Sequence, residues 1–355
     1  METLVQIGKP SVSVAQQHPR VERSDPSPIV QIGKPQPPPR TAPSDASPNN
    51  LVQLRRKKPG VPKQGPEARR PPWLRIKVQR TESFEEVNNL IEGLSLNTVC
   101  EEARCPNIWE CWGEHKTATF MILGDICTRA CRYCSVTSGR PKATDPNEPE
   151  NVGKAVQTMG LRHAVITSVD RDDLPDFGAG HWVDTIESIR RLSPECKIEI
   201  LAPDFNGDWE QLRRVLDARP DVFAHNTETV PSLYRRMRSK GKYDRCLEVL
   251  RQIDAYRREH GIAMTTKTGI MCGLGEELDE LLQVMDDLRE VNCDVITLGQ
   301  YLNPTKRHAP VARFYTPEEF DDLKLEALKR GFKHVVSGPL VRSSYHAHEH
   351  VPENL

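Results

Sequence analysis

The sequence predicts an α/β protein whose main domain is an open, partial (β/α)6 barrel of the TIM type. Two observations carry this prediction. Strand-like apolar segments alternate with helix-like segments between residues 117 and 331, and this alternation is typical of parallel strands connected by helices. It gives six βα units, which are too few for the closed barrel of eight.

The strand-like segments are rich in aliphatic and β-branched residues, and they are expected at 117–123, 163–169, 197–201, 221–226, 264–271 and 294–302. Helices are expected at about 148–159, 180–192, 207–219, 244–259, 276–290 and 317–331. In barrels of this kind the chemistry collects in the loops that follow the carboxyl ends of the strands. The loop after the first strand is therefore the first place to look for a site.

Residues 1–72 differ in composition from the rest of the chain. They are rich in Pro, Ser and Gln and contain no Cys, so they cannot bury enough apolar surface to offset the entropy of ordering. LVQIGKP at 4–10 recurs as IVQIGKP at 29–35, and both a repeated binding motif and repeat slippage account for it. Acidic residues such as Glu2 and Glu22 argue against a mitochondrial transit peptide. We expect a disordered tail (1–72), an N-terminal extension (73–116) and the barrel (117–355).

Composition sets further limits on the function. The formal net charge is −1 over 355 residues, so no global charge points to nucleic acid. No apolar run reaches the length of about 18 residues that a membrane span needs. Without an apolar signal segment a disulfide framework is not expected, and we expect a cytoplasmic protein with reduced cysteines.

Six of the ten cysteines lie within 35 residues, in two triplets of different spacing. The first is C-x4-C-x5-C and the second C-x3-C-x2-C: Cys100, Cys105, Cys111 and Cys127, Cys131, Cys134. Each triplet offers three thiolates where an iron–sulfur cube takes four ligands, so one iron stays open to another ligand. Structural zinc prefers paired C-x2-C spacings, and only Cys131 and Cys134 have one. Iron–sulfur ligation is therefore favoured over zinc. The other cysteines, at 196, 246, 272 and 293, are interpreted as buried apolar residues.

The second triplet, within GDICTRACRYC after the first strand, resembles the motif of the radical S-adenosylmethionine enzymes. The resemblance implies that Cys127, Cys131 and Cys134 hold a [4Fe-4S] cluster whose fourth iron binds S-adenosylmethionine. In that family the reduced cluster cleaves the cofactor to a 5′-deoxyadenosyl radical, which removes hydrogen from unactivated carbon.

The first triplet, in NTVCEEARCPNIWECW, resembles the auxiliary-cluster motif of the lipoyl synthase family. Further segments stand in the order that this family shows, over roughly residues 75–350: ITSVDRDDLPDFGAGH, IEILAPDF, HNTETVPSLYRRMR, TKTGIM, TLGQYLNPT and GPLVRSSYHA. The resemblance implies that Cys100, Cys105 and Cys111 hold a second [4Fe-4S] cluster. It also implies that Ser344 of RSSY binds the fourth iron of that cluster.

The reaction implied by this resemblance is that of a sulfurtransferase. Two molecules of S-adenosylmethionine would each remove a hydrogen from C6 or C8 of an octanoyl chain that is amide-linked to a lysine of a lipoyl carrier protein. The auxiliary cluster would donate both sulfur atoms and be consumed. The implied partners are the octanoylated carrier, an electron donor such as flavodoxin or ferredoxin, and an iron–sulfur carrier that rebuilds the cluster.

Four residues in the loops after the second and fourth strands are candidates for contact with S-adenosylmethionine. Asp170 and Arg171 lie in DRDDLPD, where a solvated turn is the alternative, and Asn226 and Glu228 lie in HNTETV. Two other functions stay open from the sequence: a sulfur-inserting radical enzyme similar to biotin synthase, and a non-enzymatic iron–sulfur or zinc module.

Overall fold

The computed structural model describes residues 70–76, 78, 81–115, 117–345 and 347. The chain divides into two units, Met1–Gln53 and Leu54–Leu355, of which the first lies outside the described residues. The predicted tail and its repeat therefore also lie outside them, apart from residues 70–72. The boundary between extension and barrel at 116/117 stays a prediction.

Eight strands form one sheet in the order β1-β2-β5-β6-β7-β8-β9-β10. Their bounds are β1 Asn97–Thr98, β2 Thr119–Ile122, β5 His163–Ser168, β6 Lys197–Leu201, β7 Val222–Ala224, β8 Thr265–Cys272, β9 Val295–Gln300 and β10 His334–Gly338. Only β1 is antiparallel to its neighbour; the other pairs are parallel. In the described part of the chain β1 and β10 pair with no further strand, so the predicted open α/β barrel is confirmed.

The sheet has one more parallel strand than the six units predict. All six predicted strands are present, and β10 pairs with β9 along its whole length, from His334 to Gly338. Its sequence, HVVSG, contains only two strongly apolar residues, which explains why the apolar pattern did not reveal it. The first predicted strand is β2, and the pair β3 (Ile126–Cys127) and β4 (Thr137–Ser138) frames the loop that follows it.

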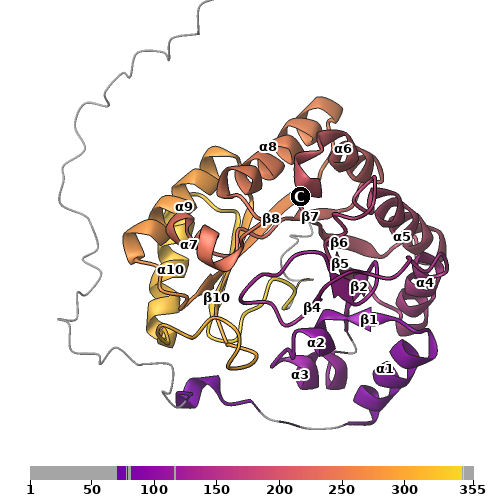
Figure 1. Cartoon of the computed structure of the whole chain (residues 1–355), viewed down its shortest axis with the longest axis horizontal. Helices are drawn as coiled ribbons and strands as arrows, with labels where there is room; N and C mark the ends of the chain where they lie inside the picture. The colour runs from indigo at the N-terminus through magenta and orange to yellow at the C-terminus, as the bar shows by residue number, and fades with distance from the viewer. Residues whose placement is uncertain (1–69, 77, 79–80, 116, 346, 348–355) are drawn as a thin grey trace, which may run out of the picture. The chain divides into compact units, whose positions relative to one another are not determined.

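The helices have the bounds α1 Glu82–Gly93, α2 Val99–Glu102, α3 Ile108–Gly113, α4 Glu148–Met159, α5 Ala179–Leu192, α6 Trp209–Asp217, α7 Pro231–Met237, α8 Tyr243–His260, α9 Leu278–Glu290 and α10 Pro317–Lys329. Of these, α4, α5, α6, α8, α9 and α10 lie along the outside of the curved sheet (Figure 1). The amphipathic pattern explains their packing: in α5, Trp182, Ile186 and Ile189 are fully buried at helical spacing. Among the described residues, no helix is both long and apolar enough to span a bilayer.

The N-terminal extension is a small aromatic cluster beside β2. Phe84 of α1 stacks on Trp109 of α3 with ring centroids 4.8 Å apart, and it also contacts Trp112. The hydroxyl of Thr81 caps α1 by accepting from the backbone N–H of Phe84. This packing fixes α3, which carries Cys111, while Cys100 lies on α2 and Cys105 in the turn between the two helices.

Candidate active site

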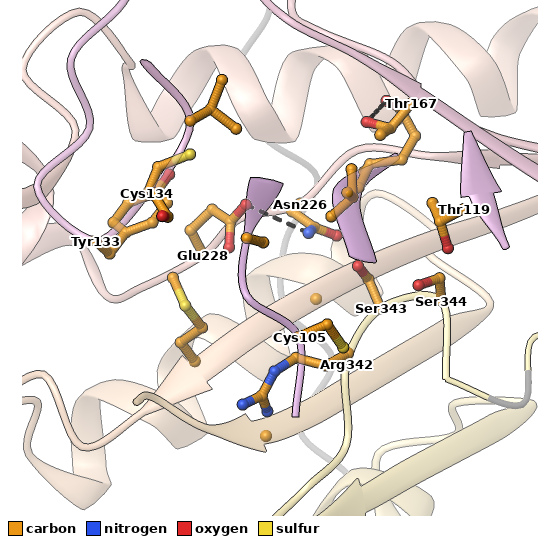
Figure 2. Close-up of a pocket in the computed structure, with 18 of the residues that line it drawn as sticks. Cys105, Thr119, Tyr133, Cys134, Thr167, Asn226, Glu228, Arg342, Ser343 and Ser344 are labelled. Atoms are coloured by element: carbon orange, nitrogen blue, oxygen red, sulfur yellow. Dashed lines mark hydrogen bonds between the residues drawn. The ribbon is translucent and has the colours of Figure 1, made fainter. Parts of the chain in front are cut away.

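A cavity of about 690 Å³ opens at the carboxyl ends of the parallel strands and borders both cysteine triplets. Its lining includes all three cysteines of the second triplet, Cys127, Cys131 and Cys134, and two of the first, Cys100 and Cys105. Cys111 lies behind them, outside the lining. Figure 2 shows Cys134 and Cys105 with the Asn226–Glu228 pair between them in that view.

The second triplet forms a group of buried thiols in the loop after β2. Burial raises the pKa of Cys127 to about 11 and that of Cys134 to about 12. Burial also raises the pKa of Cys131, although the guanidinium of Arg238 opposes it. Since iron is bound by thiolates, loading a cluster here displaces protons.

Backbone donors already point at one of these sulfurs. The N–H groups of Arg129 and Asp170 donate to Sγ of Cys127 at 3.4 and 3.3 Å. Such N–H···S bonds favour the thiolate over the thiol. The carboxylate of Asp170 lines the cavity close to the same sulfur, at 3.8 Å.

Arg129 fastens the cysteine loop to the barrel. Its side chain is only 3% exposed, and its guanidinium lies 2.8 Å from Asp172, 2.7 Å from Asp204 and 3.2 Å from Asp170. Burial acts to raise the pKa of Asp204, but Arg129 and Arg245 hold that pKa well below its ordinary value. Three carboxylates from the loops after β5 and β6 therefore share one cation of the cysteine loop.

The loop after β9 supports the other side of the cysteine loop. His308 Nε2 lies 2.9 Å from the carbonyl oxygen of Cys134, and the N–H of Ala309 donates to the carbonyl oxygen of Arg132 at 2.8 Å. This loop carries the KRHAP segment, which the sequence did not connect with the site. Chain segments more than 170 positions apart thus hold the second triplet.

Asn226 and Glu228 follow β7 and line the cavity; their predicted contact with S-adenosylmethionine stays a prediction. Asn226 Nδ2 donates to Glu228 Oε1 at 3.3 Å (Figure 2), while Asn226 Oδ1 is buried and has no hydrogen-bond partner in the described structure. Burial raises the pKa of Glu228, opposed by Arg238. Arg238 itself donates to the carbonyl oxygen of Asn226 at 3.0 Å. An unsatisfied amide oxygen beside a carboxyl group fits a ligand that brings hydrogen-bond donors, such as an amine.

Arg171 has a different environment from Asp170. Its guanidinium donates to Asp173 at 2.8 Å, to the carbonyl oxygen of Leu123 at 3.2 Å and to that of Lys142 at 3.1 Å. It does not belong to the described lining of the cavity. Its contact with S-adenosylmethionine stays a prediction that these bonds do not support.

The first triplet is also a group of coupled, buried thiols. Burial raises the pKa of Cys100 and of Cys111 to about 12, and neighbouring thiols of the triplet add to both shifts. Burial raises the pKa of Cys105 as well, but the nearby Arg342 opposes this. The thiols of this triplet therefore affect one another's ionisation, and the guanidinium of Arg342 favours the thiolate of Cys105.

The C-terminal RSSY segment lies against this triplet. Asn107 Nδ2 donates to the carbonyl oxygen of Leu340 at 2.8 Å, and the hydroxyl of Tyr345 donates to the carboxylate of Glu110 at 2.9 Å. These bonds place Ser343 and Ser344 in the lining of the same cavity as Cys105 (Figure 2). Ser344, from the far end of the chain, therefore lines the same cavity as Cys100 and Cys105, and its role as the fourth ligand stays a prediction.

The composition of the two triplets fits iron–sulfur clusters. Each triplet consists of three free cysteines, and five of the six line one cavity. A cubane takes four ligands, one for each iron. Two triplets beside one cavity, each one ligand short, fit two [4Fe-4S] groups.

Comparisons with known proteins agree with this site. The model of the radical SAM superfamily matches residues 121–288, and fold and cysteine loop together define a radical SAM enzyme. The model of the N-terminal domain of lipoyl synthase matches residues 44–105, and so begins inside the predicted tail.

Lipoyl synthase of Rubrobacter xylanophilus is 55% identical over 280 residues, covering 79% of this chain and 86% of that protein. Lipoyl synthase of Oceanobacillus iheyensis is 53% identical over 283 residues, covering 80% and 89%. The chain belongs to the lipoyl synthase family.

This membership confirms the predicted resemblance, the class of enzyme, and the use of S-adenosylmethionine with two [4Fe-4S] clusters. Sequence reasoning missed three arginines at the site: Arg129, Arg238 and Arg342. Arg129 lies inside the CTRAC motif, and that position was the one available signal. Arg238 and Arg342 stand in the quoted segments HNTETVPSLYRRMR and RSSY, but nothing in those segments distinguishes them, and only the fold brings them to the cavity.

Proposed function

We propose that this chain inserts two sulfur atoms into a protein-bound octanoyl-lysine, at C6 and C8, with each cysteine triplet in a separate role. Cys127, Cys131 and Cys134 would hold the cluster that binds S-adenosylmethionine, and the other triplet with Ser344 would hold the auxiliary cluster. The observation that carries the proposal is the single cavity that borders both triplets and Ser344. When bound, the cluster on Cys127, Cys131 and Cys134 supplies the electron that cleaves S-adenosylmethionine, and the auxiliary cluster supplies sulfur.

The chain's own residues prepare this cavity. The N–H groups of Arg129 and Asp170 orient the sulfur of Cys127, and the unpartnered oxygen of Asn226 is free to accept from the amine of S-adenosylmethionine. Apolar side chains of the strands, among them Met121 and Leu201, line the space between the triplets. They suit an alkyl chain and keep water from a radical. Because a radical removes the hydrogen atoms, the proposed reaction needs no general acid–base pair for these steps.

The partners follow from the same chemistry. The substrate is an octanoylated lipoyl carrier protein or domain, whose lysine arm must reach the cavity from outside. An electron donor of the flavodoxin or ferredoxin class would reduce the cluster that binds S-adenosylmethionine, and an iron–sulfur carrier would rebuild the auxiliary cluster. The cytoplasm, where thiols stay reduced, is the proposed location.

Cys105→Ala tests the division of roles. Anaerobic turnover of an octanoyl-lysyl carrier is followed by mass spectrometry for two added sulfurs, and 5′-deoxyadenosine is measured in the same samples. We expect 5′-deoxyadenosine to form while no lipoyl group appears, because only the auxiliary site is damaged. Lipoyl product from this variant would remove the first triplet from its role.

Iron content separates this proposal from its rivals. Reconstitution should give about eight irons per chain, from two cubes of four. Cys105→Ala should fall toward about four, and a matched change in the second triplet, Cys131→Ala, should do the same. Only the latter should abolish 5′-deoxyadenosine. An enzyme similar to biotin synthase would not lose iron on changing Cys105, and a zinc module would hold little iron at all.

A further inference from the structure

The inner wall of the cavity is built in rows that run across neighbouring strands. Side chains alternate between the two faces of a strand, so only every second residue faces inward. Strand register pairs residues of β2, β5 and β6 into two such rows that line the cavity. The row nearer the cysteine loops is Met121, Thr167 and Leu201, and the deep row is Thr119, Val165 and Glu199. Glu199 thus belongs to the deeper of the two rows that line the cavity; the next pair down, His163 and Lys197, is not part of the lining.

A buried ion pair closes this deep level. Lys267 precedes Gly269, which lines the cavity from β8, by two positions and so lies one level deeper on the same strand face. Its Nζ lies 2.6 Å from Glu199 Oε1, and His163 Nε2 lies 3.2 Å from Glu199 Oε2. The side chains of Lys267 and Glu199 are 0% and 2% exposed. The pair joins β6 to β8 across the intervening β7.

The pair is held firmly in place. Burial acts to raise the pKa of Glu199, but Lys267 and His163 outweigh it and hold that pKa at about 2, so the carboxylate is ionised. Separating the two charges would break a fully buried ion pair in a low-dielectric interior, which is strongly unfavourable. Two long side chains that cannot move apart form a rigid floor.

We propose that the Glu199–Lys267 ion pair is the stop that limits the acyl chain to the length of an octanoyl group. This inference rests on the proposed function, in which C6 and C8 must lie between the two triplets. An alkyl chain that enters from the cysteine loops passes the apolar side chains of Met121 and Leu201 before it reaches the pair. A longer chain has no room below, and its reacting carbons are displaced outward. A displacement of about 1 Å costs on the order of a hundredfold in rate.

The test removes both members of the pair, because removing one member leaves the other buried charge without this ion pair. In Glu199→Ala/Lys267→Ala the floor is lowered. The binding of octanoyl-lysyl and decanoyl-lysyl carrier peptides is measured by fluorescence anisotropy on the cluster-loaded protein. We expect the octanoyl-to-decanoyl affinity ratio to fall by about tenfold or more, since one methylene in an apolar pocket is worth about 10- to 200-fold in selectivity.

A second double variant separates volume from charge. Glu199→Leu/Lys267→Met removes both charges but keeps two long side chains at the floor, so its octanoyl-to-decanoyl ratio should stay at the parental value, whatever its absolute affinity. If this variant relaxes the ratio as much as the alanine pair, the pair does not act as a steric stop. An unchanged ratio in the alanine pair overturns the proposal directly.

Val165→Phe tests the same floor without touching the ion pair, in case the alanine pair does not fold. Val165 lies beside Glu199 in the deep row, so added bulk there shortens the cavity. We expect the octanoyl-to-hexanoyl affinity ratio to fall by about tenfold, and an unchanged ratio contradicts the assigned floor. These ratios need no turnover. Absent sulfur insertion by the parent protein would therefore refute the proposed function, while shifted ratios would still identify the floor.

Discussion

Arg129→Met should destabilise the protein strongly, because one buried cation holds three carboxylates. The guanidinium contacts Asp170, Asp172 and Asp204, and its side chain is 3% exposed. Methionine keeps much of the apolar stem and removes only the charge and the donors. Asp204 keeps Arg245, at 3.1 Å, so the loss falls on Asp170 and Asp172 above all.

The size of the effect follows from burial. Breaking a buried ion pair by removing one partner costs about 3–5 kcal/mol. For a domain of this size each kcal/mol lowers the melting temperature by about 2–4 °C, so a fall of about 6–20 °C is expected. Because Arg129 lies between Cys127 and Cys131, the same change should loosen the cysteine loop and reduce the iron retained there.

Anaerobic thermal unfolding, followed by circular dichroism, measures the shift. Lys240→Ala is the matched control: Lys240 pairs with the same Asp172, at 3.4 Å, but its side chain is 56% exposed. Exposed pairs contribute about 0.2–1 kcal/mol, so the control should melt within about 4 °C of the parent. If Arg129→Met melts as close to the parent as the control does, the carboxylate cluster does not fasten the loop.

Three further outcomes follow from the same contacts. The pKa of Glu199 in the folded protein, about 2, lies below its ordinary value of 4.5. The ionised carboxylate therefore contributes about 3 kcal/mol to the free energy of unfolding above pH 4.5, and this contribution is lost as the pH falls toward 2. Glu199→Gln should lose this acid dependence when urea unfolding is measured at a series of pH values, and an unaltered dependence on pH would contradict the argument. Ser344→Ala should lose lipoyl formation in the mass-spectrometric assay while still releasing 5′-deoxyadenosine, and unchanged turnover removes this serine from the ligands. Asn107→Ala should free the C-terminal segment at Leu340, so that limited proteolysis cuts there sooner than in the parent, with 5′-deoxyadenosine release preserved.

The sequence predicted the features that arise from local pattern. The six predicted strands and the six predicted helices of the barrel were found, because both signals come from residues adjacent in the chain. Helix α1 was missed, although Phe84, Val87 and Ile91 are buried on one face of it. The two triplets were found for the same reason: the spacings of Cys100–Cys111 and Cys127–Cys134 are written in one short stretch. Figure 1 shows how little of the remaining architecture is local, since β2 and β10 lie far apart in the sequence but in one sheet.

The contacts that the sequence could not predict join distant segments. Arg129 meets its carboxylates about 40 to 75 positions away, and no pattern in either segment shows the pairing. Cys246 is another case. It is buried, as predicted, but its sulfur accepts from Tyr234 at 3.1 Å and from Arg238 at 3.4 Å and lies 3.3 Å from His225 Nε2. His225 and Arg238 lower the pKa of this thiol against the effect of burial. A single cysteine on a helix gives no sign of such surroundings.

The two triplets also differ in how they are held, and the difference agrees with their proposed roles. The second triplet lies on the central barrel and is fixed by a buried arginine–carboxylate cluster, the most costly kind of contact to break. The first lies on the short helices α2 and α3 and the turn between them. Its contacts with the C-terminal segment include hydrogen bonds from Asn107 to the carbonyl oxygen of Leu340 and from Tyr345 to Glu110, and a hydrogen bond is typically worth about 1 kcal/mol. Local opening takes place where few contacts must be broken. A cluster that persists through turnover belongs on the first kind of support, and one that is dismantled and rebuilt belongs on the second. Amide hydrogen exchange should therefore be faster at residues 340–345 than in the loop of Cys127. Slower exchange at 340–345 would show that the strength with which each triplet is held is unrelated to the role of its cluster.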